Sequence, residues 1–309
     1  MPLPPLKDPG NATSRLRGNL RGLIFAGILF PALLVLNLAQ TASLVLLPLS
    51  RGAFRKTNRF IADTWWGWCV LLARRLNSVQ VLITGDDVPP QENAIVVANH
   101  QQMADITVLF ELAWRKSRLG DLKWYVKNAL KYFPGIGWGM IFLDCLFIKR
   151  NWTEDKDYID RVFSRILKDQ VPVWVASFAE GTRSTPSKLE GSREYARQKG
   201  LPELEHLLLP RTKGFVATFA ALRDHVDAVY DVTIGYEDGV PTLAQWCKGY
   251  VPRAHLYVRR FPSAGLPRSD AELTAWLIAR YQEKDALLGE FYKSGAFSLT
   301  DDGTRGDPT

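Results

Sequence analysis

Two short polar segments of this 309-residue chain carry side chains that could do chemistry. Residues 99–105 read Asn-His-Gln-Gln-Met-Ala-Asp and place His100 five residues before Asp105. A neutral imidazole can accept a proton from a hydroxyl at physiological pH, and a carboxylate on its far nitrogen fixes the tautomer and stabilises the imidazolium. The spacing permits such a catalytic pair. Taken alone, this spacing more often marks a helix-capping Asp beside an unrelated His.

Residues 180–183 form the second segment and read Glu-Gly-Thr-Arg. Arg183 could hold a phosphate group through two parallel hydrogen bonds. Thr182 could add a hydroxyl donor, and Gly181 would let the backbone approach a ligand closely. We expect Glu180 to orient Arg183 or to close the loop, rather than to touch an anionic ligand. The alternative is a surface turn with a local ion pair.

Other polar residues give weaker signals. Lys149 and Arg150 follow an apolar run and could hold a second anionic group, although any exposed basic pair looks the same. The chain has no G-x-S-x-G motif, so a serine nucleophile lacks its usual mark. A dinucleotide fingerprint would need a third glycine where Met140 stands, so we interpret residues 135–137 as a tight turn near the membrane.

The remaining histidines and all cysteines lack partners at ligand spacing, so we expect neither a metal site nor a disulfide framework. These residues are His206, His225, His255, Cys69, Cys145 and Cys247. Free cysteines favour a reducing, cytosol-facing domain. The net charge of +7 favours anionic partners such as membrane surfaces or phosphorylated substrates. Nucleic acid is not expected as a partner, because the sequence shows neither a basic stripe nor a known binding module.

Both polar segments follow apolar runs, at residues 94–98 and 171–178, which predict buried strands. The end of a strand is the usual place for chemistry in an α/β domain. Further strands are predicted at 79–84, 123–126 and 143–148. Helices are predicted at 106–116 and 154–169, and a third opens at the capping pattern Ser269-x-x-Glu272. This alternation predicts one α/β domain over residues 77–295, with a mixed sheet flanked by helices, followed by a flexible tail at 296–309.

An N-terminal membrane-embedded helical segment is predicted to precede this domain. Residues 1–21 form a basic tail, and residues 22–76 a membrane-associated helical segment with no charge between Arg21 and Arg51. The apolar stretch is too long for a removed signal peptide and too short for two crossings. Similar basic residues on both flanks favour a re-entrant helical hairpin, with one tilted span as the alternative. The tryptophans of residues 65–68 suit either the lipid headgroup layer or packing on the domain core.

These features together resemble the lysophospholipid acyltransferase family, which contains the 1-acylglycerol-3-phosphate acyltransferases. His100 and Asp105 match its His-x4-Asp motif, and residues 180–183 match its Glu-Gly-Thr-Arg block. Residues 147–150 are similar to the block G-x-x-F-I-x-R, and residues 209–215 to the block built around Pro210. The resemblance covers roughly residues 60–290 and is closest to the eukaryotic branch, which includes lysocardiolipin acyltransferases. The string Glu283-Lys-Asp285 is also similar to that branch.

Two departures from the family pattern stand out. Asp144 occupies the position where the second block usually has glycine. The C-terminal hydrophobic pair of many animal members is not found before Thr309, so we expect membrane attachment through the N-terminal segment and nearby aromatic surface.

The resemblance implies acyl-CoA-dependent transfer onto the free hydroxyl of a lysophospholipid, giving phosphatidic acid when the acceptor is 1-acylglycerol-3-phosphate. It implies His100 as general base oriented by Asp105, and Arg183 with residues 180–182 as the holder of the acceptor phosphate. Arg150, Pro210 and Lys213 would be further binding residues. Acyl-CoA would be a co-substrate, and no cofactor or metal is expected. The expected location is the endoplasmic reticulum membrane, with the catalytic domain facing the cytosol. Alternatives are the same chemistry on lysophosphatidylinositol or lysocardiolipin, and a non-catalytic lipid-binding protein.

Overall fold

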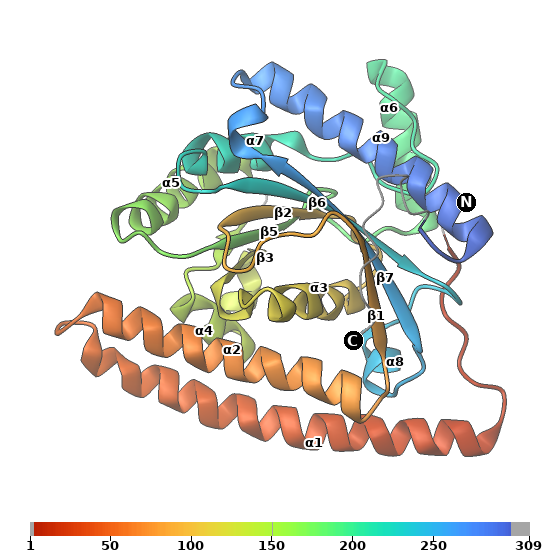
Figure 1. Cartoon of the computed structure of the whole chain (residues 1–309), viewed down its shortest axis with the longest axis horizontal. Coiled ribbons are helices and arrows are strands. Elements are labelled where there is room, and N and C mark those ends of the chain that lie inside the picture. Colours follow the sequence, from red (N-terminus) through yellow and green to blue (C-terminus); the bar gives the residue numbers. More distant parts are fainter. Residues whose placement is uncertain (1–2, 150, 298–309) are drawn as a thin grey trace.

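A mixed β-sheet forms the centre of the computed structural model, which describes residues 3–149 and 151–297 (Figure 1). In the described residues the strand order is β1-β7-β6-β2-β5-β3-β4. Adjacent strands are parallel, except that β6 and β7 run antiparallel. The predicted fold class is therefore confirmed. The strands are β1 (Gln80–Gly85), β2 (Ala94–Ala98), β3 (Leu122–Lys127), β4 (Leu146–Ile148), β5 (Trp174–Phe178), β6 (Ala228–Tyr236) and β7 (Arg253–Pro262).

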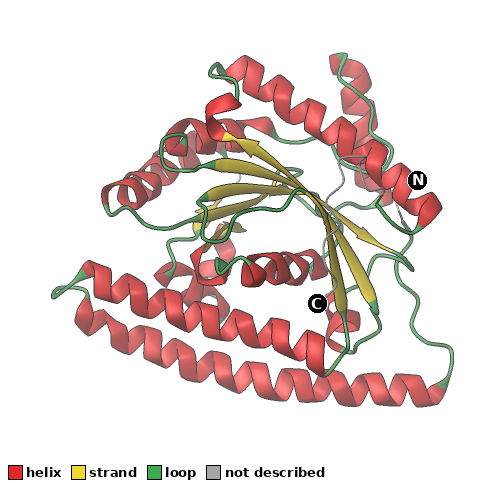
Figure 2. Cartoon of the chain, in the orientation of Figure 1, coloured by secondary structure: helices red, strands yellow, loops and turns green. Residues whose placement is uncertain are grey.

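Helices cover both faces of the sheet (Figure 2). On the side of the first face lie α3 (Ala104–Arg115) and α4 (Ile136–Phe142), then α2 (Arg51–Arg75), with α1 (Ala12–Ala42) as the outermost layer against α2 and α4. The second face lies under α5 (Trp152–Lys168), α7 (Thr212–Leu222) and α9 (Asp270–Ser294), while α6 (Pro186–Lys199) and α8 (Leu243–Cys247) lie at the periphery. Successive residues of β2 point to opposite faces, so Val96 enters one core and Ile95 the other. Burial on both faces explains why this strand is uniformly apolar.

Most predicted elements appear near their expected bounds, and two strands are shorter than predicted. The structure has β4 only at Leu146–Ile148 because Asp144 adopts a left-handed conformation with φ of 56°, which cannot continue a strand. The β5 strand begins at Trp174, after Pro172, which has no amide hydrogen to give to a ladder. Helix α5 spans Trp152–Lys168, close to the predicted range.

The N-terminal segment differs from the prediction. One continuous helix, α1, runs from Ala12 through Pro31 to Ala42. Residues 12–21 therefore belong to this helix and not to a separate basic tail. The apolar stretch does not reverse in its middle, as the favoured hairpin required. Asn11 caps the helix, since its Oδ1 accepts a hydrogen bond from the Ser14 amide at 2.7 Å. Asn37 and Gln40 are accommodated within the helix, where Asn37 Nδ2 donates to Gln40 Oε1 at 2.9 Å.

The chain reverses at residues 43–50, so α2 returns alongside α1 (Figure 1). Trp65 joins the two helices by donating from Nε1 to the Leu29 carbonyl oxygen at 3.0 Å. Trp66 is buried in the core and Trp68 is exposed, so α2 serves both the domain and the surface. Helix α1, with its extension to Leu46, is long and apolar enough to cross a membrane, and only 17% of its most apolar window is buried.

The C-terminal helix α9 begins where the sequence predicts. Ser269 caps it by accepting a hydrogen bond from the Glu272 amide at 3.3 Å. The predicted tail starts too early, because Phe297 is buried against Phe291 and Tyr257. Residues 298–309 of that tail lie outside the described residues.

Candidate active site

The two polar segments leave the sheet side by side at the same edge. Strands β2 and β5 are parallel neighbours, and their last residues, Ala98 and Phe178, are register partners. The loops that begin at Asn99 and Ala179 therefore start from adjacent positions at the carboxyl ends of the strands. The prediction that both segments follow buried strands is confirmed.

His100 and Asp105 form a hydrogen-bonded pair, with Nδ1 of the imidazole 3.0 Å from Oδ2 of the carboxylate. Asp105 lies in the first turn of α3 and is fully buried. Its Oδ2 also accepts hydrogen bonds from the amides of Gln101 at 2.6 Å and Gln102 at 2.8 Å, and Tyr236 donates its hydroxyl to Oδ1 at 2.7 Å. Because Asp105 accepts the hydrogen bond from the ring, the imidazole proton lies on Nδ1 and Nε2 is left as the basic nitrogen.

Packing and backbone contacts hold the imidazole in place. The His100 ring stacks on Phe178, with ring centroids 4.0 Å apart and planes inclined by 14°. The preceding side chain, Asn99, bonds to both backbone groups of Ile234 on β6: Nδ2 donates to the carbonyl oxygen at 3.1 Å, and Oδ1 accepts from the amide at 2.7 Å. The His100 loop therefore contacts the strands on both sides of β2, β5 through Phe178 and β6 through Ile234.

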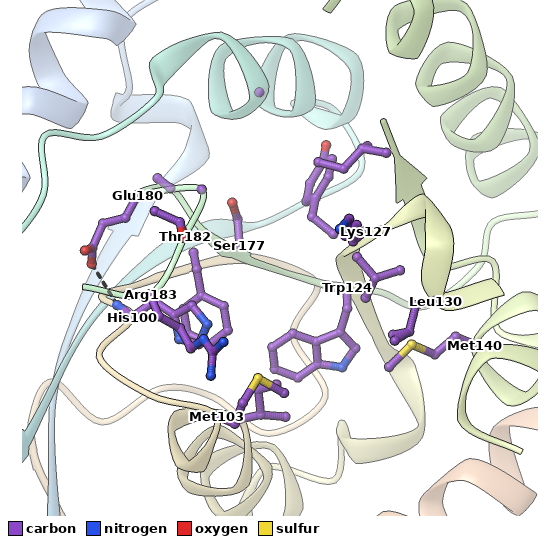
Figure 3. Close-up of a pocket in the computed structure, with 18 of the residues that line it drawn as sticks. His100, Met103, Trp124, Lys127, Leu130, Met140, Ser177, Glu180, Thr182 and Arg183 are labelled. Atoms are coloured by element: carbon purple, nitrogen blue, oxygen red, sulfur yellow. Dashed lines mark hydrogen bonds between the residues drawn. The ribbon is translucent and has the colours of Figure 1, made fainter. Parts of the chain in front are cut away.

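Glu180 closes the site and does not orient Arg183. Its Oε1 accepts a hydrogen bond from the His100 amide at 2.7 Å, and its Oε2 accepts from the Leu208 amide at 3.3 Å (Figure 3). Burial raises the pKa of this carboxyl group to about 8, although both amides favour the charged form. The side chain joins three loops, so of the two expected roles the structure places it in loop closure.

The rest of the second segment is built around a glycine turn. Gly181 has φ of 69°, and a Cβ atom there would lie 2.8 Å from Cδ of Arg211. Glycine adopts this left-handed conformation without strain, and any larger residue would also displace the Arg211 side chain. Lys188 Nζ donates to Thr182 Oγ1 at 2.7 Å, and Arg183 Nη1 donates to Gln102 Oε1 at 2.8 Å. The guanidinium is thus held beside the His100 loop with other donors free for a ligand.

A cavity of about 1620 Å³ opens at this edge and brings most of the predicted residues together (Figure 3). His100, residues 180–183, Pro210 and Lys213 all line it, whereas Asp105 lies behind the imidazole. Arg150 lies outside the described residues. Part of the wall is apolar and comes from α1, α2 and α4, through Leu29, Leu33, Trp65, Ile136 and Met140 among others. The basic lining residues are Lys127, Arg183, Lys188, Arg211 and Lys213.

Several residues of this site were not predicted. Tyr236 lies 131 positions from Asp105, and no local pattern marks the contact. Lys127 gave no signal beyond standing at the end of a predicted strand. Arg211 and Lys188 could have been found, because Arg211 lies within the block around Pro210 and Lys188 follows Arg183 by five residues. Within the described residues, no group of three or more His, Cys, Asp or Glu side chains could hold a metal ion.

Known proteins are similar to this chain in sequence. The Acyltransferase family model matches residues 80–237, and the model for the acyltransferase C-terminus matches residues 245–308. A probable 1-acyl-sn-glycerol-3-phosphate acyltransferase 5 from Arabidopsis thaliana is 34% identical over 244 residues, covering 79% of this chain and 65% of that protein. Human 1-acyl-sn-glycerol-3-phosphate acyltransferase delta is 36% identical over 283 residues, covering 90% of this chain and 75% of that protein.

The chain thus spans about two thirds to three quarters of the length of these relatives. A crystal structure of the 1-acyl-sn-glycerophosphate acyltransferase PlsC from Thermotoga maritima aligns with a TM-score of 0.49 at 18% identity, covering 89% of this chain and 98% of that one. The family match includes both polar segments and the strands that carry them. This chain belongs to the acyltransferase family.

Proposed function

We propose that this enzyme transfers an acyl group from acyl-CoA to the free hydroxyl of 1-acylglycerol-3-phosphate, giving phosphatidic acid. The observation that carries the proposal is the His100–Asp105 pair beside a cavity with both a basic and an apolar lining. The acceptor has a phosphate and a fatty chain, and the donor has a long acyl chain, so both substrates need such a mixed surface. The names of the relatives support this choice of acceptor.

The geometry supports direct transfer with general-base catalysis. Nε2 of His100 takes the proton of the acceptor hydroxyl, while Asp105 stabilises the imidazolium. The hydroxyl oxygen forms a bond to the thioester carbon, the carbon–sulfur bond breaks, and CoA leaves as a thiolate that can take the proton from Nε2. A thiolate is a good leaving group, so a base and correct positioning suffice, without a cofactor.

Arg183 is assigned to the acceptor phosphate. Its side chain lines the cavity beside the catalytic loop, and guanidinium groups bind phosphate in a bidentate way. Thr182, Lys188, Arg211 and Lys213 surround the same region and add positive charge or a hydroxyl. Arg150 is assigned a second anion-binding role from the family resemblance alone.

We also assign the enzyme to a membrane, where its lipid substrates are dissolved. The exposed apolar residues of α1 and the aromatic surface around α4, which includes Phe133 and Trp138, suit contact with lipid. Free Cys69, Cys145 and Cys247 support a reducing compartment, so we assign the catalytic domain to the cytosolic side, at the endoplasmic reticulum.

A transfer assay with purified protein tests the function. Labelled acyl-CoA is offered with a panel of lysophospholipids, and lysophosphatidate should give the highest kcat/KM. A preference for lysophosphatidylinositol or lysocardiolipin would reject the assigned acceptor. Binding of lysophospholipids with no transfer to any of them would identify a non-catalytic lipid-binding protein.

Two substitutions separate the assigned roles. His100→Ala should lower kcat by about 100- to 10,000-fold, the usual contribution of general-base catalysis. His225→Ala removes an imidazole remote from the cavity and should keep kcat.

Arg183→Ala should raise the KM of the acceptor by about ten-fold, the effect of losing one charge-assisted contact. Arg197→Ala, on the exposed face of α6, serves as its control. A larger effect of Arg183→Ala on the KM of acyl-CoA would reject the phosphate assignment.

A further inference from the structure

One buried face of α9 lies behind the catalytic loop. It contains Tyr281, Lys284, Asp285 and Leu288, spaced so that their side chains share one side of the helix. Two of the four carry a charge, which is unusual for a buried face and requires partners for both groups. The helix lies across β6 on the sheet face opposite α3, as Figure 1 shows.

Lys284 binds two neighbouring strands, β2 next to its last residue and β6 near its middle. Its side chain is fully buried, and Nζ donates to the carbonyl oxygens of Val97 at 3.1 Å and Val232 at 2.8 Å. It also forms an ion pair with Asp231. Tyr281 adds a hydrogen bond from its hydroxyl to the Ala98 carbonyl oxygen at 3.2 Å. Helix α9 therefore holds the last two residues of β2, directly before the catalytic loop.

Asp285 binds a different loop through three consecutive amides. Its Oδ2 accepts from the Glu205 amide at 2.8 Å, and its Oδ1 accepts from the amides of His206 at 2.7 Å and Leu207 at 3.0 Å. One carboxylate thus fixes the backbone of residues 205–207. Three charge-assisted hydrogen bonds to one short segment make this contact rigid.

The next amide along the chain leads to the catalytic base. The Leu208 amide donates to Oε2 of Glu180, and Oε1 of the same carboxyl group accepts from the His100 amide. Two buried carboxyl groups therefore connect α9 to the backbone of His100, in the order Asp285, residues 205–208, Glu180, His100.

We propose that Asp285 is a positioning residue for the general base, acting through residues 205–208 and Glu180, while Lys284 fixes the end of β2. The proposal rests on the proposed function and adds α9, which belongs to the segment matched by the C-terminal family model, to the catalytic apparatus. Movement of the Glu180 carboxyl group would move the His100 backbone and misalign Nε2. A misaligned base lowers the rate of the chemical step, and so kcat, more than it weakens substrate binding.

The test compares two α9 variants that differ in their contact with this path. Asp285→Asn keeps the shape of the side chain, but its amide group cannot accept all three hydrogen bonds. It should lower kcat by about ten-fold or more and change the KM of either substrate by less than about three-fold. Leu273→Ala removes a core side chain from the start of the same helix, remote from the path. It should lower Tm at least as much and keep kcat within about two-fold, since the catalytic loop is untouched. Glu290→Gln, at an exposed carboxylate of α9, should change neither.

Hydrogen exchange of the full-length variants gives a readout that is independent of activity. Asp285→Asn should speed amide exchange in residues 99–105 and 205–208, whereas Leu273→Ala should leave both segments unchanged. The proposal is overturned if exchange in 99–105 stays at the wild-type rate, or if the kcat loss of the two variants follows their loss of Tm. A wild-type protein without acyl transfer would reject the proposed function, and hydrogen exchange would then still decide whether α9 fixes the His100 loop.

Discussion

At the scale of single residues, the site depends on two buried carboxyl groups, Asp105 and Glu180, which have different hydrogen-bond donors. Asp105 accepts hydrogen bonds from two backbone amides and a tyrosine in addition to His100, so both of its oxygens have partners. Glu180 is equally buried but has only two amide donors, and its pKa is raised to about 8.

The raised pKa of Glu180 predicts a pH dependence of stability. Between its ordinary value of 4.5 and about 8, the folded state binds more protons at this group than the unfolded state, so the free energy of unfolding should fall as pH rises. The slope from this group is at most about 1.4 kcal/mol per pH unit. Denaturant unfolding in detergent at pH 5, 6, 7 and 8 should show a shallower decline for Glu180→Gln than for wild type. Parallel curves for the two proteins would contradict the raised pKa, and Glu290→Gln should retain the wild-type slope.

At the scale of elements, Asp144 joins α2 to the α/β domain. Its carboxylate pairs with Arg55 of α2, and Arg165 of α5 lies 3.5 Å away. Arg55 also binds Asp169, just after α5, at 2.9 Å. Asp144 keeps the left-handed backbone conformation that glycine adopts most easily. The departure from the family pattern thus retains the turn and adds a link to α2.

A double-mutant cycle tests this link. Asp144→Asn tolerates the left-handed conformation and removes the charge, so it should lower the free energy of unfolding by about 1–2 kcal/mol, between the values for exposed and buried ion pairs. Arg55→Met keeps much of the side-chain volume. The coupling energy between the two changes, measured by denaturant unfolding, should be at least about 0.5 kcal/mol. Additive effects would show that the ion pair does not stabilise the packing of α2.

Strands β1 to β5 and the His100–Asp105 pair were predictable from local patterns: apolar runs for the strands, and two side chains five residues apart at one strand end. Strands β6 and β7 were not predicted. The contacts of the His100–Asp105 pair with Tyr236 and Glu180 were not predictable, because they join residues 131 and 80 positions apart, separations that no local pattern encodes. The course of α1 was mispredicted for the same reason. Asn37 looks unfavourable in an apolar helix until its contact with the Gly135 carbonyl oxygen at 3.2 Å is known.

At the scale of the whole molecule, the apolar surface is concentrated on one side. The exposed large apolar residues of α1 include Leu34, Val35 and Leu38, and the α4 segment, with Trp138 and Ile141, packs beside the same helix. Such a surface is larger than isolated apolar side chains would give and suits lipid contact. The cavity that holds His100 is walled in part by the same helices.

Charges placed on this surface should weaken membrane binding. Leu34→Asp with Leu38→Asp should disfavour the membrane-bound state by about 5 kcal/mol, from the cost of two charges inside a spanning helix. Flotation of the protein with vesicles, without detergent, measures the effect. Tm in detergent should change little because both side chains are exposed. Lys199→Asp on α6 is the matched control, and equal flotation of the double variant and this control would exclude α1 from the lipid interface.

The attachment of α1 at two distant points has a consequence for kinetics. A Cβ atom at Gly18 would lie 2.2 Å from Tyr250, so the start of the helix sits tightly on the domain, and Asn37 binds Gly135 near its other end. These two contacts therefore fix the position and the orientation of the α/β domain relative to α1. On a membrane, His100 would meet only acceptors that diffuse laterally to it. The concentration that governs saturation is then the number of acceptor molecules per unit of bilayer area. Dilution of the acceptor with inert lipid lowers this surface concentration and should therefore lower the rate.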